Sequence, residues 1–196
     1  MLRVVLAPVE AYLKGLRKPL AVMVPLFIAF IAVGAMLPKP VQDALTESMG
    51  RQFEPMLRLP PVLLMIAIFL NNTLKCLAAM LLGMFFGVAP ILFVAANGVI
   101  VGLVASSFTS LKGPLATMAA ILPHGVIEIP AFIISSAIGL RLGVKFYRRI
   151  KGEHGLGAEL VAALLFFLVY LVPAFFVAAF IEAYVTPVIL SLVVRA

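Results

Sequence analysis

Six polar side chains stand inside long apolar stretches of this sequence, where burial is costly for them. They are Asn71, Asn72, Lys75, Asn97, His124 and Glu128. Ionisable residues within membrane-spanning segments normally face the interior of a helix bundle, where they pair with one another or border a pathway for ions. The six residues are therefore the candidate binding or transport site, provided that the fold brings them together.

Their positions along the chain predict two levels within a helix bundle. Helices that begin at the outer face near residues 60 and 114 and rise about 1.5 Å per residue place Lys75 and Glu128 roughly 20 Å from that face. A helix that begins at the inner face near residue 90 places Asn97 roughly 10 Å from the inner face, which is about 20 Å from the outer face of a core of about 30 Å. Asn71 and His124 lie about one turn further out. Separate helices thus agree in depth, which predicts one polar cluster.

The sequence leaves two uses of this cluster open. In the first, Lys75 and Glu128 form a buried ion pair that fixes helix register. The asparagine side chains and His124 then form hydrogen bonds with backbone groups that lose their partners where a helix is kinked. In the second, the cluster lines a passage for an ion, a proton or a small solute, because transporter sites lie near the midplane of the membrane. A dry, closed core around the pair would indicate the first use, and a water-reaching cavity ending at Glu128 the second.

Catalysis has the weakest support, and we expect a protein that is not an enzyme and needs no cofactor. His124 and Glu128 offer two metal ligands, whereas zinc sites use at least three, so metal binding stays undecided. The other histidine, His154, belongs to a basic loop. The sequence contains no His-Glu-x-x-His, Gly-x-Ser-x-Gly or phosphate-loop motif. An intramembrane protease that uses Glu128 and His124 is the remaining alternative.

The composition assigns the elements that hold these residues to a membrane. Of the 196 residues 64% are hydrophobic and 12% charged, and the mean hydropathy is +1.22. Soluble domains are roughly half apolar and a quarter charged. This excludes a water-exposed enzyme, a free nucleic-acid-binding module and a disordered tail. At about 20 residues per crossing, the chain forms a single all-α transmembrane domain over residues 1–196.

Five apolar runs are long enough to cross the membrane. The predicted spans are residues 20–37, 60–88, 90–108, 115–140 and 160–181. Pro123 and Pro130 remove backbone donors from the fourth run, so we expect a broken helix there. Apolar residues at helical spacing predict two amphipathic helices on the membrane surface, over residues 1–19 and 38–59. The apolar tail after Pro187 is too short for another crossing and is expected at the interface.

The placement of lysine and arginine predicts the orientation in the cell membrane. Nine of the 15 basic residues lie in the N-terminal helix and in a basic loop over residues 141–158, and five lie on the opposite side. Because cytoplasmic loops carry the basic excess, we expect a cytoplasmic N-terminus and an extracytoplasmic C-terminus. The net charge of +7 then faces anionic lipid headgroups rather than nucleic acid.

Three pairs of glycines four residues apart predict close helix packing. The pairs are Gly83 and Gly87, Gly98 and Gly102, and Gly139 and Gly143. In lipid, close backbone approach is a main source of helix association. We expect such pairs to pack mostly within the chain, and a symmetric homodimer is their alternative use.

One segment of the sequence resembles a known family signature. Residues 123–131, Pro-His-Gly-Val-Ile-Glu-Ile-Pro-Ala, followed by Gly139-Leu-Arg-Leu-Gly143, resemble the signature of the stage II sporulation protein M family of polytopic membrane proteins. Asn97-Gly98 with Gly102 is similar to a second patch of that family, and Asn71-Asn72 fits the preceding span. The resemblance covers about residues 59–144. By this resemblance, the residues that occupy the positions of the family motif are Pro123, His124, Gly125, Glu128 and Pro130.

The resemblance implies a non-enzymatic multi-pass protein that organises a membrane complex. In spore-forming bacteria the named member belongs to a complex with cell-wall hydrolases that acts during engulfment. Similar proteins occur in bacteria and archaea that make no spores, so a role in sporulation is not carried over. The alternative function is a channel or transporter that uses the polar cluster around Glu128 and His124.

Overall fold

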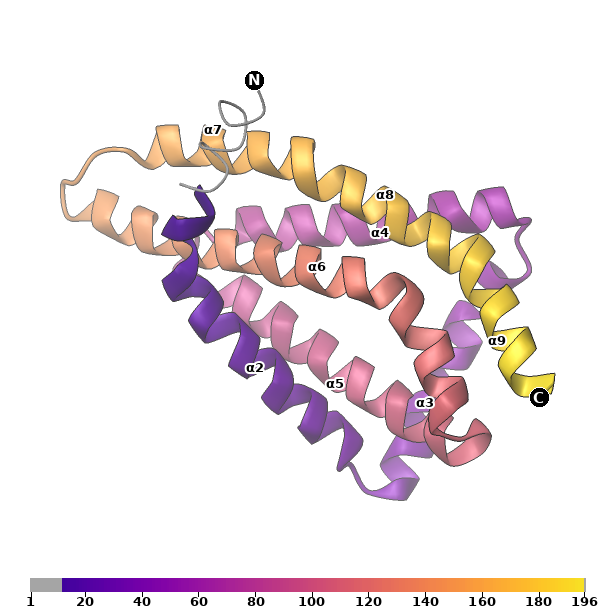
Figure 1. The fold of residues 1–196 in the computed structure, drawn as a ribbon. Coiled ribbons are helices and arrows are strands. Elements are labelled where there is room, and N and C mark those ends of the chain that lie inside the picture. The colour runs from indigo at the N-terminus through magenta and orange to yellow at the C-terminus, as the bar shows by residue number, and fades with distance from the viewer. Residues whose placement is uncertain (1–11, 196) are drawn as a thin grey trace.

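The computed structural model describes residues 12–195, which form a bundle of helices with no strand among them (Figure 1). The predicted helix over residues 1–19 falls largely outside this range, and residues 12–15 are helical. The elements are α2 (Arg17–Ala35), α3 (Lys39–Leu57), α4 (Pro61–Leu82), α5 (Val88–Lys112), α6 (Pro114–Ile150), α7 (Leu156–Phe166), η1 (Phe167–Leu171), α8 (Val172–Phe180), η2 (Ile181–Val185) and α9 (Thr186–Arg195).

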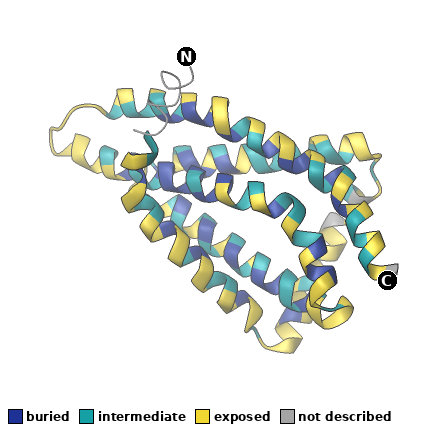
Figure 2. Ribbon diagram, in the orientation of Figure 1, coloured by how far each residue is buried: buried dark blue, intermediate teal, exposed yellow. Residues whose placement is uncertain are grey.

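The five predicted spans are confirmed. Five described segments are long and apolar enough to cross a membrane, namely α2, α4, α5, α6 and the continuous run Leu156–Val194. Large apolar side chains cover the outside of the bundle, as expected for a surface that contacts lipid, with exposed fractions of 60% for Ile28 and 63% for Leu92. Figure 2 shows the buried residues gathered on the inward helix faces. The bundle is therefore held together by packing inside an apolar surface, as in a membrane protein.

Helix α6 lies at the centre of the bundle and contacts α2, α4, α5 and the last span (Figure 1). The expectation of a broken fourth span needs refinement, because Pro123 and Pro130 lie inside one helix that runs from Pro114 to Ile150. The helix bends in its first half without ending there. The predicted basic loop over residues 141–158 is also too long. Its first ten residues continue α6, and the connection to α7 is limited to residues 151–155.

The last span is longer than predicted, because the chain continues as helix beyond residue 181 to Arg195. Two π-helical turns, η1 and η2, allow this. Each ends two residues before a proline, Pro173 or Pro187. Proline lacks the N–H that an α-helix uses and collides with the carbonyl four residues earlier, and wider turns occur where an α-helix is interrupted in this way. The tail after Pro187 thus extends the fifth span.

A close contact between α2 and α5 uses one of the predicted glycine pairs. A Cβ on Gly98 would lie 2.9 Å from the Phe27 carbonyl oxygen, and one on Gly102 would overlap the Ile31 carbonyl group. Backbone therefore packs directly on backbone, which only glycine permits here.

The other two glycine pairs meet each other. Gly83 follows the last residue of α4, and Gly87 precedes the first residue of α5. Both pack against Gly139 and Gly143 of α6, where a Cβ on Gly143 would lie 2.8 Å from the Gly87 Cα. All three pairs are buried within the chain. A dimer would have to use a different surface.

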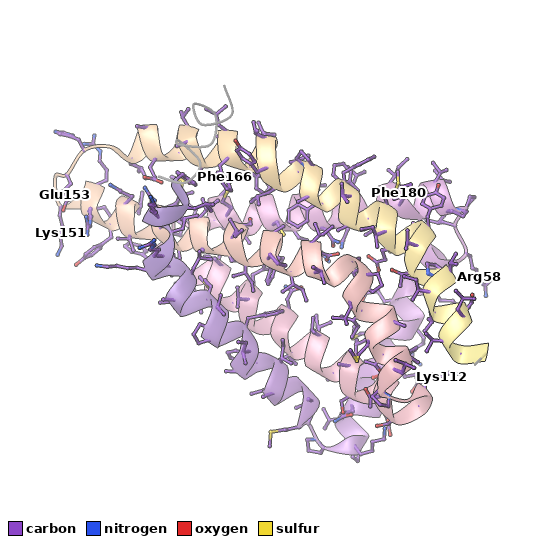
Figure 3. The ribbon with its side chains drawn as sticks, in the orientation of Figure 1. Arg58, Lys112, Lys151, Glu153, Phe166 and Phe180 are labelled. Atoms are coloured by element: carbon purple, nitrogen blue, oxygen red, sulfur yellow. The ribbon has the colours of Figure 1, made fainter. Side chains whose placement is uncertain are left out.

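The charged residues gather at the two ends of the bundle. Figure 3 places Lys151 and Glu153 at one end and Arg58 and Lys112 at the other. At the first end, the Arg141 guanidinium lies 2.8 Å from a carboxylate oxygen of Glu159 and connects α6 to α7. Charge at both ends and an apolar surface between them is the pattern of a bundle that crosses a bilayer.

Tyr12 packs beside this ion pair, with its ring 5.2 Å from the Arg141 guanidinium carbon. Burial, with the Glu159 carboxylate as a second cause, raises the pKa of Tyr12 to about 12. The phenol is therefore neutral at physiological pH, which suits its place at the edge of the apolar core.

Candidate functional site

A cavity of about 760 Å³ lies between α3, α4, α5, α6 and the last span. All six polar residues that the sequence singled out line this cavity: Asn71, Asn72, Lys75, Asn97, His124 and Glu128. The sequence-based expectation that three helices bring these residues to one place agrees with the geometry. Counting residues was enough to bring these residues together because α4, α5 and α6 are each a continuous helix through the stretch that carries them.

Helix α6 presents two of these groups on one face. His124 and Glu128 are four residues apart, so their side chains lie about one turn from each other. Pro123 and Pro130 flank them within the same helix. Gly125 beside them is buried, although no other helix comes within contact distance of a Cβ placed there.

Glu128 is held by a chain of amides from α4. The Asn72 side-chain nitrogen donates a hydrogen bond of 2.9 Å to Glu128 Oε1, and the Asn71 nitrogen donates one of 3.1 Å to Asn72 Oδ1. The second carboxylate oxygen, Oε2, is buried and finds no hydrogen-bond partner among the described residues. One oxygen is thus fixed in place while the other stays available to a ligand.

His124 has a similar free atom. Its Nδ1 is buried and has no hydrogen-bond partner within residues 12–195. Buried polar atoms are normally paired, since leaving one unpaired costs about 1–3 kcal/mol. Both atoms belong to residues that line the cavity, so an ion, solute or water bound there would satisfy them.

Glu182 is the site residue that sequence reasoning missed. It lies in η2 and lines the same cavity, and ligand atoms of His124, Glu128 and Glu182 all lie within 4.8 Å of one another. Our predicted fifth span ended at residue 181, which placed Glu182 outside the membrane. The apolar run that continues to Val194 was the signal that could have found it, because it leaves Glu182 as an isolated carboxylate inside a longer span. Thr186, one turn further on, is buried and also lines the cavity.

The predicted ion pair between Lys75 and Glu128 is wrong. Among the ion pairs of the described part of the chain, none joins these two residues. Lys75 lines the cavity but its side chain is exposed. It follows Asn71 by four residues, one turn further along α4, and Asn72 rather than Lys75 reaches Glu128. The purely structural interpretation of the cluster loses its main contact.

Asn97 lines the cavity from α5, and its side-chain nitrogen donates to the Phe93 carbonyl of its own helix at 2.8 Å. This bond satisfies the side-chain nitrogen within α5. Asn97 is therefore part of the cavity wall without a direct bond to the His124 and Glu128 pair.

Packed aromatic rings form part of the cavity wall. Phe132 lies one turn beyond Glu128 on α6, and its ring centroid is 5.8 Å from that of Phe27 and 5.3 Å from that of Phe93. The wall also includes α3, where the side chain of Gln52 is exposed.

The arrangement can bind a cation or a small polar solute and can exchange protons. It offers two carboxylates, an imidazole, an ammonium group, four amides and a hydroxyl group within a mostly apolar wall. Small-molecule sites have this character, mostly apolar with a few convergent polar groups.

The sequence is similar to proteins of one family. A family model described as Stage II sporulation protein M matches residues 22–187, a range that contains every polar residue of the cluster named above. An uncharacterized protein of Methanocaldococcus jannaschii is 35% identical over 122 residues, which cover 60% of this chain and 68% of that protein. No solved structure matches the chain.

Proposed function

Because this chain belongs to the Stage II sporulation protein M family and is built of membrane-spanning helices, we propose that it binds an ion or small polar solute within the membrane and passes it across. One observation carries the proposal. Six polar groups from α4, α5 and α6, together with Glu182 from the last span, line a single cavity of about 760 Å³. The proposed activity is binding and release, with no covalent step.

The unpaired atoms support a working site over a structural one. A polar group buried in an apolar region is destabilising unless it is hydrogen-bonded, and structural clusters satisfy their own members. Here Glu128 Oε2 and His124 Nδ1 are left without partners among the described residues. A bound ion, solute or water would satisfy both atoms.

We propose that the α3 side of the cavity is its mouth and that the packed rings of Phe27, Phe93 and Phe132 form its floor, which must open for passage. Phe132 is 7% exposed and Phe27 is 4% exposed, as expected for rings that close one side of a cavity. A site that is open on one side and closed by movable side chains on the other fits alternating access, in which the two barriers open in turn.

Flux through liposomes tests the proposal. Purified protein is reconstituted, and uptake of protons, K⁺, Mg²⁺ and Zn²⁺ is followed with the wild type, with Glu128→Gln and with Glu153→Gln. Glu153 is an exposed carboxylate in the connection between α6 and α7, so its variant is the matched control. We expect flux from the wild type and the control and a loss of at least about tenfold in Glu128→Gln. Equal flux from all three proteins, or none from any, would overturn the proposal.

The role of organising a membrane complex, which the resemblance implied, stays a prediction, and so does a homodimer. Both need a protein-facing surface. The glycine pairs that would be the natural candidates are covered by the chain's own helices. Cross-linking in native membranes would test for a partner on the remaining outer faces.

The membrane partner that we propose is anionic lipid. A groove of about 420 Å³ between α2 and α6 is lined by four basic residues, Lys18, Arg141, Lys145 and Arg148. Basic pockets between membrane helices bind the headgroups of anionic lipids. We expect the double variant Lys145→Gln/Arg148→Gln to retain less phosphatidylglycerol through purification than the wild type. The control variant Lys112→Gln, at the opposite end of the bundle, should retain the same amount as the wild type. Equal retention by both variants would contradict this expectation.

A further inference from the structure

We propose that His124, Glu128 and Glu182 together bind a divalent transition-metal ion, and that this ion is the species the cavity accepts. The inference rests on the proposed function, because it names the occupant of the same cavity. The inference is based on one observation: one imidazole and two carboxylates from two helices have ligand atoms that all lie within 4.8 Å of one another.

The spacing suits a single ion. Ligand atoms bound at about 2.1 Å in a tetrahedral site lie about 3.4 Å apart, so the three side chains need to close by little more than 1 Å to share one metal. His124 and Glu128 are fixed relative to each other by their positions on α6. Glu182 comes from η2, a π-helical turn of the last span. Such turns occur often at functional sites.

The charges also favour a cation. Two carboxylates close together in a region of low dielectric repel each other when both are ionised. A divalent ion carries the charge that balances both. Lys75 lines the same cavity but forms no ion pair with either glutamate among the described residues. A bound cation would therefore supply the charge that balances the two ionised carboxylates.

The hydrogen bonds around Glu128 match those of a metal ligand. In metal sites the ligating carboxylate is itself held by further hydrogen bonds, which orient it. Asn72 donates to Glu128 Oε1 and Asn71 donates to Asn72, while Oε2 is left free among the described residues. The amide pair therefore presents one oxygen of Glu128 to the ion.

The donor set selects a class of metal. Imidazole favours zinc, iron, copper and nickel, whereas calcium takes six to eight oxygen ligands. One nitrogen and two carboxylates provide a three-residue set that leaves positions free for water. Such an open site binds an ion without enclosing it, as a transport site must.

Calorimetry with Zn²⁺ tests the inference in detergent-solubilised protein that has first been treated with a chelator. We expect one Zn²⁺ per chain for the wild type and affinity more than about 100-fold weaker for Glu182→Gln, because loss of a direct ligand exceeds the 10–100-fold cost of losing an outer partner. His154→Asn is the control. It removes the other histidine, which lies in the connection between α6 and α7 and is not among the residues that line the cavity, and we expect it to bind like the wild type.

X-ray absorption of Zn²⁺-loaded wild-type protein gives a second measurement, which does not depend on a variant folding. We expect a first shell of nitrogen and oxygen with one imidazole and no sulfur. A sulfur ligand, an unchanged affinity in Glu182→Gln or the absence of stoichiometric binding would each overturn the metal site.

The two proposals fail differently. If the wild type binds no Zn²⁺ yet shows flux that Glu128→Gln abolishes, the metal inference is wrong and the transport function stands. If Zn²⁺ binds at one per chain and no species crosses the liposome, the metal site stands and the transport function is wrong.

Discussion

Asn72 on α4 and Glu128 on α6, which both line the polar cavity, are joined by a hydrogen bond of 2.9 Å. It is the one bond between the described side chains of the site that links two spans. It replaces the ion pair that the sequence suggested for Lys75, and it keeps one carboxylate oxygen in a fixed position. Several consequences of this arrangement can be measured.

Replacing Asn72 by alanine should destabilise the protein and weaken its site. Glu128 would lose its donor, and hydrogen bonds to charged groups contribute about 1.5–3 kcal/mol. We expect a lower melting temperature in detergent and Zn²⁺ affinity reduced by about 10–100-fold. Asn97→Ala is the control, since that amide bonds to the Phe93 carbonyl of its own helix. A larger loss in Asn97→Ala than in Asn72→Ala would contradict this assignment.

Truncation of Phe132 should open the floor of the cavity. Its ring packs against both Phe27 and Phe93, so Phe132→Ala removes the contact that separates the cavity from the other end of the bundle. We expect faster passive ion leak in liposomes, together with a loss of stability of about 3–5 kcal/mol typical of such a truncation.

Phe180→Ala serves as the comparison for that variant, because Phe180 is 46% exposed and lies away from the cavity lining. It should leave both leak and melting temperature near the wild-type values. A leak that is the same in the two variants would show that Phe132 is not a barrier.

Addition of a single methyl group at Gly143 should loosen the packing of α6. A Cβ there would lie 2.8 Å from the Gly87 Cα, and backbone cannot move aside as a flexible side chain can. We expect Gly143→Ala to lower stability by about 1–3 kcal/mol, as overpacking does. Gly157→Ala, where nothing lies within 4 Å of the added atom, should be neutral or slightly stabilising. Melting curves measure the stability of the two variants, and equal melting temperatures would contradict this prediction.

The predicted orientation can be tested by labelling single cysteines. The chain has one cysteine, Cys76, so Cys76→Ser gives a background without thiols. In intact cells a membrane-impermeant maleimide should label Gln52→Cys on α3 and should reach Glu153→Cys only after permeabilisation. The reverse pattern would place the N-terminus outside the cell and would move the mouth of the cavity to the cytoplasmic side.

The polar cluster was predictable from sequence because its residues are conspicuous in apolar helices of regular rise. Depth along a straight helix follows from counting residues, and this brought Asn71, Lys75, Asn97 and Glu128 to one region. The angle around each helix does not follow from counting. That is why Lys75 was assigned to Glu128, when Asn72 is the residue that reaches it.

The ends of the helices were less predictable, because proline and charge were taken as stops. A proline ends an α-helix only if the backbone cannot widen locally, and at Pro173 and Pro187 it widens into π-helical turns. Arginine and lysine after residue 140 continue α6 to Ile150, since a helix can project beyond the apolar layer into water. Glu182 was missed because the predicted fifth span ended at residue 181, directly before this charged residue.

The wide turn η1 also determines the direction in which the later side chains of the last span point around the helix axis. Each residue of an α-helix advances by about 100° around the axis, and a π-helical turn uses one residue more than an α-helical turn. Removing one residue from Phe167–Leu171 would therefore swing Glu182 through about that angle, away from His124 and toward the acyl chains. The direction in which the last carboxylate points is thus decided about three turns earlier, by a segment that has no polar chemistry of its own.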